Sequence, residues 1–160
     1  MIWLPEVLAV PERGLEGDRY FHGRGSFSRW PGEGRDVTLI EREAVDFLLR
    51  EHGIDLRDGR SRRNITTAGG SLAELNGRKF RIGGAVLRGA RECAPCRHLE
   101  RLIVAGLFDA MKGRGGLRAN ILEAGRSVSA TSSSRSSRRG SRRSPCARLA
   151  RPGPRGADLE

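Results

Sequence analysis

The sequence has few cysteines, few aromatic residues and no long apolar segment. Only 5% of its 160 residues are aromatic, and no window approaches the ~18 consecutive apolar residues that a membrane-spanning helix needs. Met1–Glu6 lacks the basic start and the long apolar core of a secretory signal peptide. The three cysteines are odd in number and two of them are three residues apart, which argues against the disulfide framework of a small secreted protein. We therefore expect a cytoplasmic protein with reduced thiols and no membrane association.

Acidic residues are scarce toward the C-terminal end. From Arg126 onward nine arginines are accompanied by two acids, so this segment carries +7 of the total net charge of +11. Ser and Arg fill 18 of the 30 positions from Arg126 to Arg155, and large apolar residues are almost absent. Such a segment cannot bury enough surface to offset the ~1–2 kcal/mol per residue that backbone ordering costs. We predict one folded domain in residues 1–125 and a disordered Arg/Ser-rich tail in residues 126–160.

Short β-strands separated by glycine-rich turns dominate the predicted domain. Asp36–Ile40 is β-branched and apolar, and Lys79–Ile82 alternates polar with apolar residues. Gly83-Gly84 then predicts a turn, and Ala85–Arg88 is the expected returning strand of a hairpin. Asn120–Leu122 is a further short strand candidate. Several such strands favour a barrel or sandwich over a parallel α/β sheet.

Three segments have helical patterns. Glu41–His52 carries apolar residues at helical spacing, and Gly53 is a typical C-terminal stop. Ser71–Glu74 matches a capping box and predicts a short helix. Pro95–Leu102 is the third helical segment and could continue toward Met111. The expected fold is therefore mainly β with short helices.

The stretch richest in reactive groups is Arg91-Glu92-Cys93-Ala94-Pro95-Cys96-Arg97-His98-Leu99-Glu100. Pro95 is expected at the first position of a helix, which would place Cys96 in the first turn. The unpaired N–H groups and the positive dipole end of that turn favour a thiolate, as do the cationic Arg97 and His98. A thiolate is the form of cysteine that attacks electrophiles and binds thiophilic metals.

Three other interpretations of the two cysteines remain open on local pattern alone. A thioredoxin-type redox pair needs a βαβ setting, whereas the strand before Cys93 belongs to an apparent hairpin. A structural zinc site needs two further ligands, but there is no second CxxC and the histidines are scattered. The third interpretation is a pair of partly buried thiols without chemistry.

Six segments together resemble the MOSC domain family. Their order and spacing match over some 115 residues, which is more specific than any one segment. The segments are Gly14–Tyr20, Asp36–Glu41, Arg62–Thr67, Leu75–Gly83, Cys93–Leu99 and Gly113–Ala119. The subtype with Arg-Arg-Asn before Ile and with Cys-x-Pro-Cys-x-His-Leu-Glu is the best match.

The resemblance implies a β-barrel-like sheet with short helices around it, and a role in handling the molybdenum cofactor. Family members include the C-terminal part of molybdenum cofactor sulfurases and the amidoxime-reducing proteins. Their reactive cysteine corresponds to Cys96, which would be a molybdenum ligand or a sulfur acceptor. The chain would reduce N-hydroxylated compounds with an electron-donor protein, or transfer sulfur from a donor protein to the cofactor. It contains no pyridoxal-phosphate desulfurase domain, so it is not expected to mobilise sulfur from free cysteine alone.

The molybdenum cofactor is an anionic phosphorylated pterin, so its site requires cationic and hydrogen-bonding groups. Arg62, Arg63 and Asn64 lie on an expected loop, and the resemblance implies that Arg63 and Asn64 contact the cofactor. Arg118 follows two glycines and is predicted either to reach the same pocket or to pair with an acid. Arg19 is a further candidate contact.

Local pattern also leaves structural alternatives for neighbouring polar residues. Asp18 and Arg19 could form a salt bridge rather than bind the cofactor. His22 is expected to be a surface residue, although a proton donor is the alternative. His98, one turn from Cys96, is better placed to tune the thiol and is predicted as a catalytic residue with it.

The sequence departs from the family pattern at both ends, so we expect a barrel that is incomplete there. Only seven residues precede Leu8, where family members usually carry an additional strand. After Gly125 the usual apolar strand with a Gly-Asp turn is replaced by Arg126–Ser133. The abrupt change and the Arg, Ser, Pro and Gly bias lead to the hypothesis of a shifted reading frame in GC-rich coding DNA. An intact frame on resequencing would exclude it.

If the tail is genuine, a nucleic-acid-binding function is the alternative from a different class. An Arg/Ser-rich segment can bind phosphates with salt-sensitive affinity. The tail has no aromatic residue for base stacking, so such binding would be weakly selective.

Overall fold

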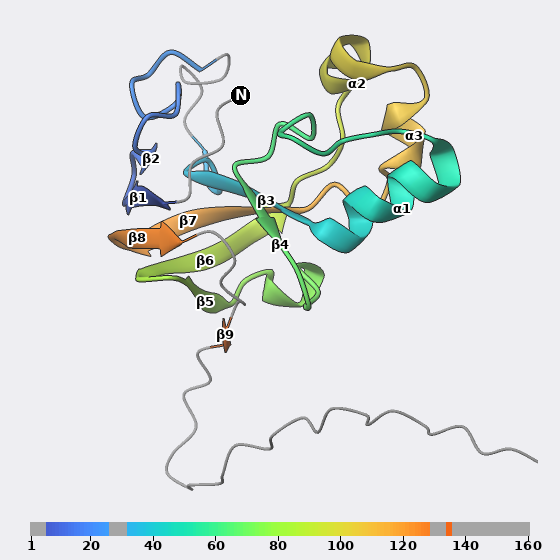
Figure 1. Ribbon diagram of the computed structural model, residues 1–160. Coiled ribbons are helices and arrows are strands. Elements are labelled where there is room, and N and C mark those ends of the chain that lie inside the picture. The colour runs from blue at the N-terminus through green and yellow to red at the C-terminus, as the bar shows by residue number, and fades with distance from the viewer. Residues whose placement is uncertain (1–5, 26–31, 129–133, 136–160) are drawn as a thin grey trace, which may run out of the picture.

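The chain folds into two β-sheets with short helices at one end, as the computed structural model shows (Figure 1). The structure describes residues 6–25, 32–128 and 134–135. A three-stranded antiparallel sheet has the order β2-β1-β8, and a curled six-stranded sheet has the order β4-β3-β7-β6-β5-β9. The elements are β1 (Glu6–Val10), β2 (Gly14–Leu15), β3 (Val37–Glu41), α1 (Arg42–His52), β4 (Ile65–Thr67), the 3-10 helix η1 (Ala73–Leu75), β5 (Lys79–Ile82), β6 (Ala85–Glu92), α2 (Arg97–Ile103), α3 (Leu107–Ala110), β7 (Leu117–Glu123), β8 (Gly125–Val128) and β9 (Ser134–Arg135). The expected fold class, mainly β with short helices, is confirmed.

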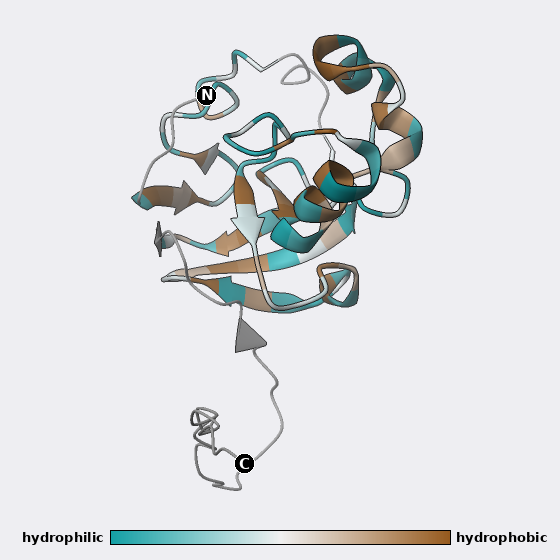
Figure 2. Cartoon of the chain, turned by 45° about the vertical axis from the view of Figure 1, so that its right-hand side comes forward, coloured by the Kyte–Doolittle hydropathy of each residue, from teal (hydrophilic) through white to brown (hydrophobic). Residues whose placement is uncertain are grey.

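The first apolar core covers one face of the six-stranded sheet. Alternate residues of each strand face it, and η1 and the three-stranded sheet complete it. Its members are Ala9, Leu15, Val37, Leu39, Leu72, Leu75, Phe80, Ile82, Ala85, Leu87, Leu117, Ala119 and Ile121. Figure 2 shows this as brown hydrophobic positions along the strands. Burying each large apolar side chain stabilises the fold by roughly 1.5–3 kcal/mol.

The second core lies between the opposite face of the sheet and the three helices. Ile40 of β3 packs there against α1, α2 and α3, which lie together at one end of the sheet (Figure 1). Helix α1 buries Ala44, Val45 and Leu48. Gly53 adopts a left-handed conformation with φ 65° and its N–H donates to the carbonyls of the last turn, which confirms the predicted stop. In the described residues no helix is long and apolar enough to cross a bilayer.

Helix η1 differs from its prediction at the N-terminus. The pattern Ser71–Glu74 predicted a side-chain cap from Ser71, but η1 begins after Leu72 and no side chain caps it. The Leu72 N–H instead donates to Oε1 of Glu41, the last residue of β3, at 2.6 Å. The capping-box prediction was wrong because a tertiary acceptor takes the place of the local one.

Strand β8 crosses the domain boundary that the sequence predicted at residue 125. Residues 125–128 pair with β1, from Ala9↔Gly125 to Glu6↔Val128, and Nη1 of Arg126 lies 3.4 Å from Oε2 of Glu6. Ser134 and Arg135 form β9, which pairs with β5. The rest of the predicted tail lies outside the described residues. A deletion that tests the tail should therefore retain Gly125–Val128, because removing them would expose β1.

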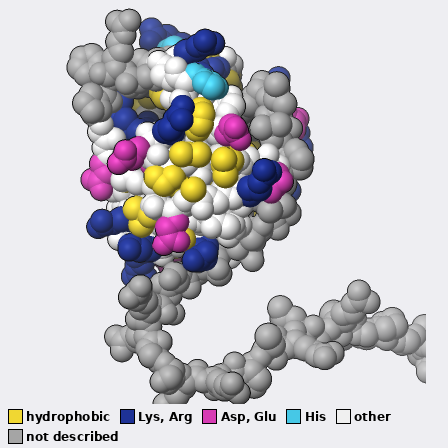
Figure 3. Space-filling model, turned by 90° about the vertical axis from the view of Figure 1, so that its left-hand side faces the viewer, with side chains coloured by type: hydrophobic (Ala, Val, Ile, Leu, Met, Phe, Trp, Pro, Cys, Tyr) yellow, Lys and Arg dark blue, Asp and Glu magenta, His cyan; other side chains and the backbone are white. Residues whose placement is uncertain are grey.

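The three-stranded sheet forms the side of the molecule shown in Figure 3. Apolar side chains gather in the middle of this side and are surrounded by basic and acidic side chains. Leu122, at the end of β7, has 38% of its surface exposed. Single exposed apolar residues of this kind are common on soluble domains and require no function.

Candidate functional site

Cys96 is exposed and caps the N-terminus of α2. Its backbone is extended, with φ −134° and ψ 152°, and its Sγ accepts the Leu99 N–H at 3.4 Å. The prediction that Pro95 starts the helix was wrong, because α2 begins at Arg97 and Pro95 lies in the preceding extended segment. Cys96 is therefore one position before the first turn, but its sulfur still faces the unpaired N–H groups of that turn.

Cys93 has the opposite environment. It is 1% exposed, and its N–H donates to the Gly116 carbonyl at 2.8 Å. Both thiols are free. Strand β6, which leads into Cys93, is antiparallel to both of its neighbours, so the βαβ setting of a thioredoxin motif is not the arrangement around these cysteines. Cys96 is therefore the accessible sulfur of the pair.

Arg63 holds the segment that contains Cys93. Its Nε donates to the Gly115 carbonyl at 2.9 Å, its Nη2 to the Cys93 carbonyl at 3.2 Å and its Nη1 to the Ser61 carbonyl at 3.4 Å. A side chain on Gly115 would collide with the Cys93 carbonyl oxygen, so glycine is needed for this close approach. The structure thus places Arg63 beside the cysteine segment, as expected, with three of its donors engaged by backbone carbonyls.

Asn64 is also engaged inside the protein. Its Oδ1 accepts both the N–H of Thr38, at 3.0 Å, and the hydroxyl of Thr38, at 2.8 Å. Its Nδ2 donates to Oδ2 of Asp18 at 2.7 Å, and Oδ1 of Asp18 accepts the Tyr20 N–H at 2.8 Å. Asn64 therefore ties the N-terminal turn to β3. In the structure Asp18 bonds to Asn64 rather than to Arg19.

Arg118 lies at the centre of a polar row across three strands. In the strand register it is directly opposite Thr38 of β3 on one side and Arg91 of β6 on the other. Leu117 and Ala119 face the first core, so Arg118 points to the other face of the sheet and is half-buried there. Arg91 belongs to the reactive stretch of the sequence but was not selected as a site residue, because its position opposite Arg118 depends on the strand register and on a shift after Gly89.

The remaining predicted site residues are spread over the surface. Arg19 is exposed, and its guanidinium lies 5.3 Å from the centre of the Tyr20 ring. His22 is exposed with its ring edge against Phe21. His98 is exposed on the first turn of α2. Of these three residues, only His98 lies on α2, the helix whose N-terminus Cys96 caps.

Arg62 is a cation that the loop prediction named but did not select. It is exposed, and its backbone has the left-handed φ of 53°, which is uncommon for residues other than glycine. Such strain costs of order 1–3 kcal/mol and tends to occur at functional positions. Arg62 therefore has to be considered together with Arg63 in any binding experiment on this loop.

Arg97 is turned away from Cys96 by its own contacts. Its Nη1 lies 2.8 Å from Oε1 of Glu100, and its guanidinium stacks 4.3 Å from the centre of the Phe108 ring. Oε2 of Glu100 accepts the Phe108 N–H at 2.8 Å, so Glu100 joins α2 to α3. The sequence analysis counted Arg97 as a charge that acts on the thiol, but its charge is compensated locally.

The Phe108 N–H, together with Arg97, holds the pKa of Glu100 below its ordinary value of 4.5. A carboxyl group with a lowered folded-state pKa stabilises the fold above its unfolded pKa, and this contribution is lost as the pH falls through the folded-state pKa. We expect wild type to lose thermal stability on acidification below about pH 4.5 more steeply than Glu100→Gln. Thermal unfolding between neutral and acidic pH tests this, and parallel profiles for the two proteins would contradict it.

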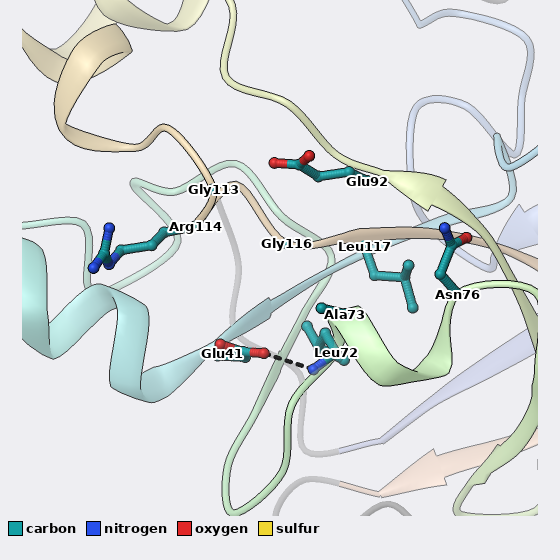
Figure 4. Close-up of a pocket in the computed structure, with 9 residues that line it drawn as sticks. All are labelled: Glu41, Leu72, Ala73, Asn76, Glu92, Gly113, Arg114, Gly116 and Leu117. Atoms are coloured by element: carbon teal, nitrogen blue, oxygen red, sulfur yellow. Dashed lines mark hydrogen bonds between the residues drawn. The ribbon is translucent and has the colours of Figure 1, made fainter.

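A cavity of about 250 Å³ lies where β3 and β6 end and β7 begins. It is lined by Glu41, Leu72, Ala73, Asn76, Glu92, Gly113, Arg114, Gly116 and Leu117. Figure 4 shows Glu41 and Glu92 on opposite sides of the Gly113–Gly116 backbone, with Arg114 directed away from both. Arg114 is occupied, since its guanidinium lies 4.1 Å from the centre of the Phe47 ring. Cys96 does not line this cavity.

Most of the chain matches the model of a known family. The sequence profile of the MOSC domain matches residues 28–134, which is more than half of the chain. The chain belongs to the MOSC domain family. MOSC domains are associated with the molybdenum cofactor. A search of curated proteins found no match.

Solved structures share the MOSC fold of this chain. YiiM from Escherichia coli is 21% identical with a TM-score of 0.61, over 83% of this chain and 63% of its own. YiiM from Geobacillus stearothermophilus is 19% identical with a TM-score of 0.59, over 67% of this chain and 57% of its own. The YuaD protein from Bacillus subtilis is 14% identical with a TM-score of 0.64, over 78% and 81%. The chain thus spans about three fifths of the length of the two YiiM structures.

Proposed function

We propose that this MOSC protein binds the molybdenum cofactor, with Cys96 as the molybdenum ligand or as a sulfur acceptor. The observation that carries the proposal is the exposed Cys96 at the start of α2, in the segment held by Arg63, within a MOSC domain. A soft sulfur donor is what a thiophilic metal centre or a sulfur carrier requires.

The proposed site includes cationic residues that suit an anionic ligand. Arg118 and Arg91 have no counter-charge among the described residues, so they can receive one. Arg19 and His98 are exposed cationic or titratable groups in the predicted site. We also assign Arg63 and Asn64 to the cofactor site. Their side-chain N–H groups that do not donate to the described residues would donate to the cofactor.

When bound, the cofactor would supply two-electron redox chemistry, and the protein residues would bind and orient it. Cys96 would hold the metal, and the arginines would hold the anionic end. Reduction of an N-hydroxylated small molecule, with electrons from a donor protein in the cytoplasm, is the reaction we favour. Sulfur transfer from a donor protein to the cofactor is the alternative.

The test is the molybdenum content of the full chain purified from a cofactor-producing host. We expect bound metal in wild type, loss of the metal in Cys96→Ser, and retention in Cys93→Ala, the matched control for a second thiol in the same segment. Circular dichroism establishes that each variant is folded. Equal metal in wild type and Cys96→Ser, or none in wild type, would overturn the proposal.

Mass spectrometry of the same samples separates the two reactions. A sulfur carrier should show Cys96 with one added sulfur atom after incubation with a persulfide donor, and reduction of that adduct by a thiol should remove it. Cys96 without such an adduct, in protein that carries molybdenum, supports the ligand role.

A further inference from the structure

We infer that Arg91 and Arg118 together form a binding site for an oxyanion, namely the phosphate group of a phosphorylated ligand. Under the proposed function, on which this identification of the ligand rests, the phosphate is that of the pterin cofactor. The inference begins from the strand register, which places the two arginines directly opposite each other on β6 and β7.

Two like charges in directly opposite positions of an antiparallel pair destabilise the sheet. In a regular pair the Cβ atoms at such positions are about 4.5–5.5 Å apart. Here a register shift between Gly89 and Arg91 lies next to the pair, which keeps Arg91 opposite Arg118. Arg118 is half-buried, so water screens its charge less than that of a fully exposed arginine. The arrangement is therefore unfavourable unless something negative lies between or above the two guanidinium groups.

The described part of the chain does not supply that negative group. Neither arginine makes an ion pair or a side-chain hydrogen bond there. No carboxylate of the described residues lies within ion-pairing distance of either guanidinium. Asp36 instead accepts the Ile121 N–H, and Asp18 accepts from Tyr20 and Asn64. Glu92 follows Arg91, but it is opposite Leu117 and so lies on the core side of the sheet.

Lys79 of β5 and Arg88 of β6 are also directly opposite each other, but both are exposed, whereas Arg118 is half-buried. Two other arginines of these sheets pair with acids. Arg81 on β5 lies 3.9 Å from Glu123, and Arg126 on β8 lies 3.4 Å from Glu6. Cross-strand pairs of opposite charge are thus available to this fold. Arg91 and Arg118 lack such an arrangement, which is expected of residues that receive their counter-charge from a ligand.

The position of the pair connects it to the cysteine segment. Arg91 is two residues before Cys93, whose N–H bonds to Gly116, two residues before Arg118. On the other flank the backbone comes close at Gly34, where an added Cβ would lie 2.8 Å from that of Ala90 and 3.0 Å from that of Arg118. Arginine forks bind phosphate by paired charged hydrogen bonds, so a phosphate monoester suits two of them.

The test measures thermal unfolding of the metal-free full chain with increasing inorganic phosphate at constant ionic strength. We expect phosphate to raise the Tm of wild type, and Arg118→Gln or Arg91→Gln to weaken phosphate binding by about tenfold or more. Arg81→Gln, an exposed arginine on the neighbouring strand, is the matched control and should respond as wild type does. A wild-type Tm that is insensitive to phosphate, or an equal response in Arg118→Gln, would overturn the inference.

A charge reversal and a metal measurement complete the test. Arg118→Glu should pair with Arg91, so its Tm without phosphate should equal or exceed that of wild type while its response to phosphate is lost. A lower Tm would contradict the predicted repulsion. In a cofactor-producing host Arg118→Gln should lose molybdenum, whereas retention at the wild-type level would show that the anion is not part of the cofactor. The phosphate titration decides the anion site even if Cys96 proves to bind no metal.

Discussion

Replacing Arg63 with glutamine should lower the free energy of unfolding by about 3 kcal/mol and increase the reactivity of Cys96. The guanidinium of Arg63 donates to three backbone carbonyls, those of Gly115, Cys93 and Ser61. A hydrogen bond from a charged donor contributes about 1.5–3 kcal/mol, and acceptors left without partners add to the loss. Two of the three bonds are longer than 3.1 Å and should each contribute less than this range, so we expect a total of about 3 kcal/mol.

The effect on Cys96 follows from where Arg63 acts. It fixes the Cys93 carbonyl, at the start of the segment that orients Cys96 at the N-terminus of α2. Without that bond the segment gains freedom, and the Sγ bond to the Leu99 N–H should break more often. Alkylation of both thiols, followed by mass spectrometry, measures this in metal-free protein. Faster labelling of Cys96 with Cys93 still protected identifies a local change rather than global unfolding.

Arg62→Gln is the control for the charge of the loop. Arg62 is adjacent and exposed, and exposed substitutions usually change stability by less than about 0.5 kcal/mol. Arg63→Lys adds a second comparison, since lysine keeps the charge but cannot bridge three carbonyls. If Arg63→Lys and Arg63→Gln behave like Arg62→Gln in urea unfolding, the structural role of Arg63 is wrong.

The sequence predicts this loop as a ligand contact, and the structure adds a second use for the same side chains. Arg63 and Asn64 have the donors that a phosphate or a pterin needs, but backbone carbonyls accept from Arg63 and the Asp18 carboxylate accepts from Asn64. A sequence motif cannot distinguish the two uses, because these acceptors, at Asp18, Cys93 and Gly115, lie far along the chain. Only the folded arrangement shows which donors are already engaged.

Some elements of secondary structure are likewise determined by the local sequence, and others by partners far along the chain. Strand β5 matches its prediction because Lys79–Ile82 alternates polar with apolar residues, and α1 matches because Gly53 ends it. Strand β8 was missed because its residues are polar and glycine-containing, and because β1, at the other end of the chain, provides its hydrogen bonds. Local pattern thus identifies elements with a one-sided apolar face, whereas pairing partners decide the rest.

The cysteine motif was predicted only in part. The sequence was sufficient to select Cys96 over Cys93, and the structure makes Cys96 the exposed thiol and Cys93 the buried one. The expected helix start at Pro95 was wrong because the Cys96 side chain itself caps α2. The basic environment was expected from Arg97, but Glu100 and Phe108 hold that side chain, whereas Arg91 on β6 and Arg118 on β7 make no ion pair within the described residues.

The second large effect on stability is expected at Gly116, whose backbone supports the cysteine segment. Gly116 has φ +94°, and a Cβ there would collide with the Leu39 carbonyl oxygen of β3. The neighbouring pair Leu39↔Leu117 joins β3 to β7 within the first core, so the strand cannot move aside without opening that core. We expect Gly116→Ala to lower the free energy of unfolding by about 4 kcal/mol or to prevent folding, since it combines strain with overpacking.

Gly113→Ala separates the two contributions to that effect. Gly113 also has a positive φ, +69°, but nothing lies within 4 Å of its added Cβ, so only the cost of the left-handed backbone, about 1 kcal/mol, should appear. The difference between the two variants in urea unfolding then measures the collision with β3. Because the Gly116 carbonyl accepts the Cys93 N–H, Gly116→Ala should also make Cys93 available for alkylation below the unfolding midpoint, whereas Gly113→Ala should not. Equal destabilisation by the two alanines would mean that β3 and β7 are not packed as closely as this register requires.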